Sequence, residues 1–189
     1  MSQFTVIADA NVLVPVILRD LLLEFAFQGM FRVRWTPHIR DEVRRTLCGE
    51  LFQLDPAKVD RLLLLMAENV LQPDVTGYEL CINKLVLPDP EDRHILAAAI
   101  IAEADTIVTF NLKHFPADYC LKQGVMVTHP DIFLAAQVTL MPGPAMAAVR
   151  TIENRWRRPD IRIAGILDRC RKIGLVETAA ELRKLSLDR

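Results

Sequence analysis

Blocks of apolar residues separated by polar turns give the first 130 residues an alternating pattern of strands and helices. Short runs rich in β-branched or aromatic residues predict four strands, at 4–8, 31–35, 106–110 and 125–127. Longer stretches between them predict helices, at 15–28, 37–47, 56–66, 95–104 and 131–137. This alternation favours a three-layer α/β/α fold around a mainly parallel central sheet.

The ends of several segments carry turn and capping residues. Thr36 followed by Pro37 predicts a capped helix start, and Gly29 predicts a helix end. A tight turn is expected from Asp9 to Asn11, directly after the first strand. Asp9 therefore belongs at the carboxyl end of a buried strand.

The most informative stretch runs from Leu87 to Pro116. Asp89 is a plausible N-cap and Pro90 suits the first helical position, which puts Asp92 in the first turn. The helix that follows is almost entirely apolar, so we expect it to be buried. The next strand ends just before Asn111. In open α/β sheets ligands bind beyond the carboxyl ends of the strands, so these polar residues mark a candidate site.

Beyond Met141 the composition changes. Pro142 and Pro144 interrupt the pattern, and three further helices are predicted at 145–156, 161–173 and 177–185. We therefore expect an α/β domain over residues 1–140 and a C-terminal helical extension over residues 141–189.

Composition sets limits on the class of protein. The chain has 189 residues, 51% of them hydrophobic, and the longest apolar run, 95–102, is far shorter than the ~18 residues that a membrane span needs. No membrane association and no secretion signal are expected. The four cysteines lie far apart with no CxxC pair, which favours free thiols in a reducing compartment. The expected location is the cytoplasm.

Charge is unevenly distributed although the net charge is only −1. Residues 1–149 hold 12 Lys and Arg against 18 Asp and Glu, whereas residues 150–189 hold 11 against 6. A basic tail on an acidic body suits contact with a polyanion or an acidic partner, and equally suits a solvated helical face.

Carboxylates and an amide are spread along the chain in the pattern of a divalent metal site. The candidates are Asp9, Glu42, Asp89, Asp92 and Asn111. Mg²⁺ and Mn²⁺ prefer such oxygen ligands, whereas clustered carboxylates without a cation repel one another. A metal-activated water would then hydrolyse a phosphodiester without a covalent intermediate.

Other chemistries have weaker support. The histidines His38, His94, His114 and His129 show no HxxxH or HxxH spacing, which argues against zinc and suggests caps, surface or core positions. No GxSxG, GxGxxG or Walker loop occurs. A haloacid-dehalogenase-like phosphatase would also place an Asp at a strand end, but usually with a second Asp at the position held here by Asn11.

With these residues in view, the chain resembles the PIN domain family, metal-dependent ribonucleases that include the VapC-type toxins of toxin–antitoxin pairs. The matching motifs are VIADANVLV, RDEV, DPEDRHILAAA and IVTFNLKHFP, which span Val6 to Pro116. The resemblance implies a PIN-like fold, an endoribonuclease and catalytic roles for Asp9, Glu42, Asp92 and Asn111. It also implies an Mg²⁺ or Mn²⁺ cofactor, an RNA substrate, an antitoxin partner and a homodimer.

One departure from the family affects the metal site. Many PIN domains carry Asp at the strand-end position that Asn111 holds, and an amide brings no negative charge. If Asp89 ligates the metal, it supplies the negative charge that Asn111 does not bring. Otherwise Asp89 is only a helix cap. The alternative function is a PIN-like module with weakened catalysis that binds RNA or a protein partner. The residues expected to contact RNA are Asn11, Arg40, Arg44 and Arg45.

Overall fold

The computed structural model describes residues 3–156 and 162–187, and contacts group the chain into two compact units. The sheet unit comprises Met1–Val14 and Phe31–His129, and the helical unit comprises Pro15–Met30 and Pro130–Arg189. The second strand thus follows a segment that belongs to the helical unit. The expected boundary between residues 140 and 141 stays a prediction.

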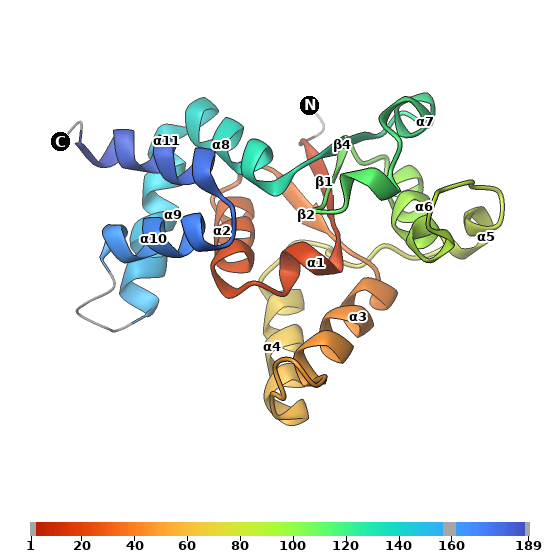
Figure 1. Ribbon diagram of the computed structural model, residues 1–189, viewed down its shortest axis with the longest axis horizontal. Helices are drawn as coiled ribbons and strands as arrows, with labels where there is room; N and C mark the ends of the chain where they lie inside the picture. The colour runs from red at the N-terminus through yellow and green to blue at the C-terminus, as the bar shows by residue number, and fades with distance from the viewer. Residues whose placement is uncertain (1–2, 157–161, 188–189) are drawn as a thin grey trace. The chain divides into compact units, whose positions relative to one another are not determined.

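Four parallel strands form the centre of the sheet unit (Figure 1), namely β1 (Thr5–Ala8), β2 (Arg32–Arg34), β3 (Thr106–Val108) and β4 (Met126–Thr128). Their order is β2-β1-β3-β4, and Ile7 of β1 pairs with Arg34 on one side and Ile107 on the other. Every residue of β1 and β3 is buried, as is usual for the central strands of a parallel sheet. The predicted α/β fold with a parallel sheet is confirmed.

Helix α6 (Arg93–Ile101) packs against β1 and β3. Its three consecutive alanines, 97–99, are completely buried, and their small side chains allow the helix backbone to approach the strands closely. The helix ends at Ile101 rather than at the predicted residue 104, because Glu103 adopts a left-handed φ of 48°. The predicted burial of this helix is confirmed.

Two longer helices of the sheet unit, α3 (Pro37–Cys48) and α4 (Pro56–Glu68), pack against each other. They are orange and yellow in Figure 1. Thr36 caps α3 by accepting a 3.0 Å hydrogen bond from the Ile39 N–H, as its sequence predicts. Helix α3 also packs against α1 (Ala10–Leu13). The turn predicted at Asp9 is therefore the start of a short helix, which Asp9 caps.

The remaining helices of the sheet unit are short: α5 (Glu79–Ile82), α7 (Ala117–Lys122) and the 3-10 turns η1 (Pro90–Asp92) and η2 (Leu112–His114). Asp89 caps η1 through a 3.0 Å bond from the Glu91 N–H, so the predicted cap is correct. The first turn after it is 3-10 rather than α.

The helical unit contains α2 (Val16–Phe27), α8 (Pro130–Leu140), α9 (Pro142–Arg155), α10 (Ile163–Lys172) and α11 (Val176–Leu187). Helix α2 packs against α9 and α10, and α11 packs against α8, α9 and α10. Helix α9 starts at Pro142 rather than at residue 145, because prolines fit in a first turn whose N–H groups have no helical partner. The predicted helix start at residue 161 lies outside the described residues.

Two polar contacts connect distant parts of the helical unit. The Arg155 guanidinium lies 2.6 Å from a carboxylate oxygen of Glu24, which is 6% exposed. Asp131 at the start of α8 accepts bonds of 2.7 to 2.9 Å from the N–H groups of Glu177 and Thr178 and the hydroxyl of Thr178. A side chain of one helix thus caps another.

In the described part of the chain, no helix by itself combines the length and the apolar composition that crossing a membrane requires. Helices α8 and α9 meet that requirement as a pair, but with a bend of 116° between them.

Candidate functional site

Asp9 sits where strand β1 passes into helix α1. Its backbone N–H donates a 3.2 Å bond to the Val108 carbonyl, so the sheet ladder fixes its position. The side chain is 5% exposed and caps α1. Asp9 is therefore held at the carboxyl edge of the sheet, as the sequence predicts.

Asn11 and Thr109 hold one oxygen of the Asp9 carboxylate. The Asn11 amide donates a 2.6 Å bond to Asp9 Oδ2 and a 3.0 Å bond to the Thr109 hydroxyl oxygen. The Thr109 hydroxyl in turn donates a 2.6 Å bond to the same Asp9 oxygen. Oδ1 of Asp9 has only a long contact, 3.5 Å, with the Asn11 N–H among the described residues. These bonds orient the carboxylate with Oδ1 available to a ligand.

Asn11 was expected to contact RNA, but its side-chain groups are engaged within the protein. Besides its two donated bonds, its carbonyl accepts a 3.2 Å bond from the Phe110 N–H. These contacts suit a positioning role. The sequence analysis did not single out Thr109, although its place directly after β3, two residues before Asn111, was a usable signal.

Glu42, Asp92 and Asn111 lie at the same pocket as Asp9. Glu42 comes from α3, Asp92 from the junction of η1 and α6, and Asn111 from the turn after β3. The pocket measures about 680 Å³, and its lining includes these four residues together with Asn11 and Arg45. Residues separated by up to 102 positions in sequence thus share one cavity.

Asp92 is oriented by a histidine. The Nδ1 of His114 lies 2.7 Å from Asp92 Oδ2 and 3.7 Å from Asp89 Oδ2. Asp89 is not part of the pocket lining, and its side chain is 39% exposed. The structure therefore places Asp89 beside Asp92 and His114, at one end of the candidate site.

Burial and mutual repulsion disfavour the charged forms of the acids. Burial raises the pKa of Asp9, and the negative charges of Asp92 and Glu42 raise it further, against the bond from Thr109. Burial also raises the pKa of Asp92, against the contact with His114. A divalent cation would relieve this cost, because it would bring two positive charges next to the three carboxylates of the pocket.

The donor set fits a hard divalent cation. Asp9, Glu42 and Asp92 offer carboxylate oxygens, and Asn111 offers an amide oxygen. In the described chain, two groups of residues each have possible ligand atoms that all lie within 4.8 Å of one another. They are Asp89, Asp92 and His114, and His38, Glu42 and His94. Asp9 belongs to neither group, so the carboxylates of Asp9, Glu42 and Asp92 line one cavity but are not all within 4.8 Å of one another.

Only one of the three arginines expected to bind RNA lines the pocket. Arg45 does so, with a guanidinium nitrogen 4.0 Å from Glu42 Oε1. Arg44 forms two bonds with Asp60, of 2.5 and 3.1 Å, and Arg40 lies 3.4 Å from Asp74. Carboxylates of the same protein therefore already neutralise Arg40 and Arg44.

Comparison with known proteins supports the sequence motifs. A family model described as PIN domain matches residues 5–113, and one described as VapC50 C-terminal domain matches residues 130–184. Over 78 residues the chain is 37% identical to "Putative ribonuclease VapC50" of Mycobacterium tuberculosis (strain H37Rv). That alignment covers 41% of this chain and 46% of the relative, less than half of either. No solved structure matches.

Proposed function

Since this chain belongs to the PIN domain family, we propose that it is a metal-dependent endoribonuclease that hydrolyses RNA phosphodiester bonds. We further propose that it acts as the toxin of a toxin–antitoxin pair. The name of the VapC50 relative supports the ribonuclease part of this proposal.

The observation that carries the proposal is the pocket shared by Asp9, Glu42, Asp92 and Asn111. These residues come from four separate segments, and burial and repulsion raise the pKa of two of the acids. Buried acids with perturbed pKa values in a cleft are typical of functional sites. A purely structural role would not need several carboxylates to face one cavity.

The residues that would hold Mg²⁺ or Mn²⁺ are Asp9, Glu42, Asp92 and Asn111, with Asp89 near Asp92. When bound, such an ion lowers the pKa of an attacking water and neutralises charge on the scissile phosphate. Every candidate ligand offers an oxygen atom. No Ser or Cys lines the pocket, and the hydroxyl of its Thr46 donates to the Glu42 carbonyl. The proposed reaction is therefore direct hydrolysis.

Residues in and beside the pocket orient these ligands, and one of them can attract the substrate. Asn11 and Thr109 keep the Asp9 carboxylate in one rotamer, and His114 does the same for Asp92. Arg45 has a side chain that is 69% exposed, so its guanidinium can reach a phosphate at the pocket mouth. Positioning of this kind is the main contribution of the protein to phosphodiester hydrolysis.

The test is RNA cleavage by the purified full chain with Mg²⁺ or Mn²⁺ and after addition of EDTA. We expect cleavage only with the metal. Loss of a residue that only supports a metal ligand typically costs about 10- to 100-fold in activity. Asp9 is a proposed ligand itself, so Asp9→Asn should lower the cleavage rate by more than that. Asp118→Asn, which changes an exposed carboxylate of α7, is the matched control and should cleave normally. Equal rates for Asp9→Asn and the wild type would overturn the assignment.

The amide at position 111 keeps a second function open, a PIN-like module that binds RNA or a protein without cutting. Thermal melting distinguishes the two. A competent site is stabilised by Mn²⁺ because the ion binds only the folded chain, whereas a degenerate site is not.

The proposed partners are an antitoxin protein and a second copy of this chain. A neighbouring reading frame that encodes a small DNA-binding protein would support the antitoxin. Co-expression should then yield a complex that has lost RNA cleavage. Light scattering of the purified chain measures whether it is a dimer.

A further inference from the structure

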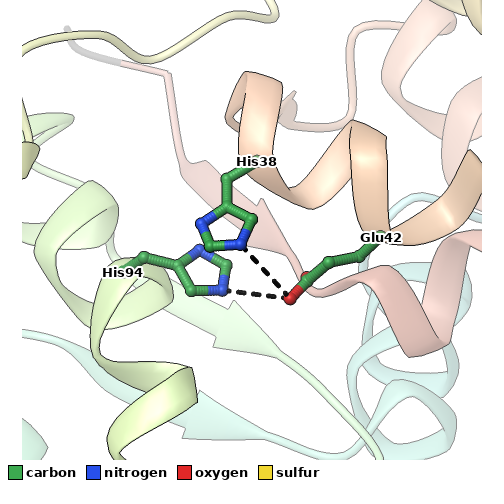
Figure 2. A group of neighbouring side chains, drawn as sticks. All are labelled: His38, Glu42 and His94. Carbon is green, nitrogen blue, oxygen red and sulfur yellow. Dashed lines mark ion pairs between the residues drawn. The ribbon is translucent and has the colours of Figure 1, made fainter. Parts of the chain in front are cut away.

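Two histidines and a glutamate from different helices meet beside the acidic pocket. His38 and Glu42 lie one turn apart on α3, and His94 lies on α6 (Figure 2). Figure 2 shows that both histidine rings face the same oxygen of Glu42. The Nε2 atom of His38 lies 3.9 Å from this oxygen, Oε1, and that of His94 lies 3.4 Å from it. The two rings are stacked, with centroids 4.0 Å apart. Three ligand atoms therefore converge on one small volume.

His94 is a buried polar side chain without a hydrogen bond. Its side chain is 3% exposed, and within the described chain neither ring nitrogen has a hydrogen-bond partner. A buried polar group left in this state costs free energy, commonly about 1–3 kcal/mol. The Nε2 atom is aimed at Glu42 at a distance too long for a good hydrogen bond. A ligand between the two atoms would satisfy both.

The spacing of the atoms fits a shared metal ion. Ligands at ~2.0–2.1 Å from a tetrahedral ion lie roughly 3.3–3.4 Å from one another. The observed 3.4 Å between His94 and Glu42 meets this requirement directly. The 3.9 Å between His38 and Glu42 needs a small movement, and the side chain of His38 is 43% exposed and therefore able to make it.

The donor chemistry differs from that of the acidic pocket. Two imidazoles and one carboxylate suit Zn²⁺, Co²⁺ or Ni²⁺, whereas Mg²⁺ prefers oxygen. Three protein ligands with an open fourth position are the composition of many zinc sites. Neither histidine lines the pocket of Asp9, and Glu42 borders both places. Arg45, 4.0 Å from Glu42, is the nearby positive charge that opposes binding.

We infer that His38, Glu42 and His94 form a second metal site, selective for Zn²⁺ and related transition-metal ions. The lack of HxxxH or HxxH spacing does not exclude zinc here, because the fold brings together histidines from two different helices. The site does not depend on the nuclease proposal. It requires only that these three side chains can bind one ion.

The test uses Co²⁺ as a visible probe with the full chain after removal of metal by EDTA and dialysis. The wild type should develop an absorption band that saturates at one equivalent of Co²⁺. An equivalent of Zn²⁺ should abolish the band, and excess Mg²⁺ should not. His38→Gln should weaken Co²⁺ binding at least about tenfold, since even an outer-shell partner is worth that much.

Matched variants separate this site from its neighbours. His114→Gln changes the group of Asp89, Asp92 and His114, and Asp9→Asn changes the acidic pocket. Both variants should keep the Co²⁺ absorption band. Because His38 is partly exposed, His38→Gln should fold, and circular dichroism checks this. His94→Gln changes the buried histidine of the group and is a second test. A band that survives His38→Gln, disappears in His114→Gln or yields to Mg²⁺ would overturn the inference.

Discussion

The amide of Asn11 donates a 2.6 Å hydrogen bond to the carboxylate of Asp9, two residues earlier in the chain. The same amide donates to Thr109, which also donates to Asp9. The most buried acid of the candidate site is thus held by side chains that follow the carboxyl ends of two adjacent strands, β1 and β3. A ligand that approaches Asp9 meets a carboxylate whose orientation is already fixed.

This contact predicts the effect of Asn11→Ala. Without the amide, Asp9 gains rotamers and Thr109 loses a donor, so we expect Mn²⁺ affinity and cleavage rate each to fall by about 10- to 100-fold. The measurements are Mn²⁺ titration and RNA cleavage at saturating RNA. Asn83→Ala, at an exposed position, serves as the control. A change confined to KM for RNA would instead support the direct RNA contact predicted from the sequence.

Asn111 provides a gain-of-function test. Asn111→Asp adds a negative charge to the pocket of Asp9, Glu42 and Asp92. We expect Mn²⁺ to bind more tightly, and the metal-free variant to melt at a lower temperature than the wild type because like charges repel. Calorimetric titration and thermal melting in EDTA measure the two effects, with Asn83→Asp at an exposed position as the control. Unchanged Mn²⁺ affinity would show that position 111 does not contact the ion.

Asp131 predicts a stability effect in the helical unit. It is 6% exposed and caps α11 through the N–H groups of Glu177 and Thr178. Asp131→Ala leaves these donors without their acceptor, so the free energy of unfolding should fall by about 2–3 kcal/mol. Urea denaturation measures this. Asp168→Ala, which removes an exposed carboxylate that pairs with Lys172, should change stability very little. A similar loss in both variants would contradict the prediction.

The cysteines should differ in reactivity. Burial raises the pKa of the Cys170 thiol to about 12, and burial also raises the pKa of Cys120. A raised pKa keeps a thiol protonated at neutral pH, and the thiolate is the reactive form. Cys48 and Cys81 are partly exposed and should react first with a thiol reagent, whereas Cys120 and Cys170 should react only on unfolding. Mass spectrometry of the labelled peptides identifies the order, and rapid labelling of Cys170 in the folded chain would refute it.

The sequence predicted those features that depend on local order. The strands, the caps Thr36 and Asp89, and the position of Asp9 at the end of β1 all follow from neighbouring residues. Since parallel strands end at one edge, Asp9 and Asn111 were expected to lie close together, and both line the pocket. Their roles in metal binding and catalysis stay predictions.

What escaped prediction depends on contact between distant elements. His38 and His94 are separated by 55 intervening residues, and only the packing of the sheet unit stacks their rings. In the sequence Thr109 is one β-branched residue in a predicted strand. Its bond to Asp9 could not be predicted, because the two residues lie 100 positions apart. Likewise, no local pattern indicates that α2 belongs with α9 and α10.

The pairing of Glu24 with Arg155 limits how this protein can be dissected. Ending the chain after residue 140 would take away Arg155, and with it the charge partner of Glu24. Helix α2 would also be stripped of α9 and α10. A catalytic fragment without the C-terminal helices is therefore a poor candidate for expression or crystallisation. Useful truncations would have to redesign α2 at the same time.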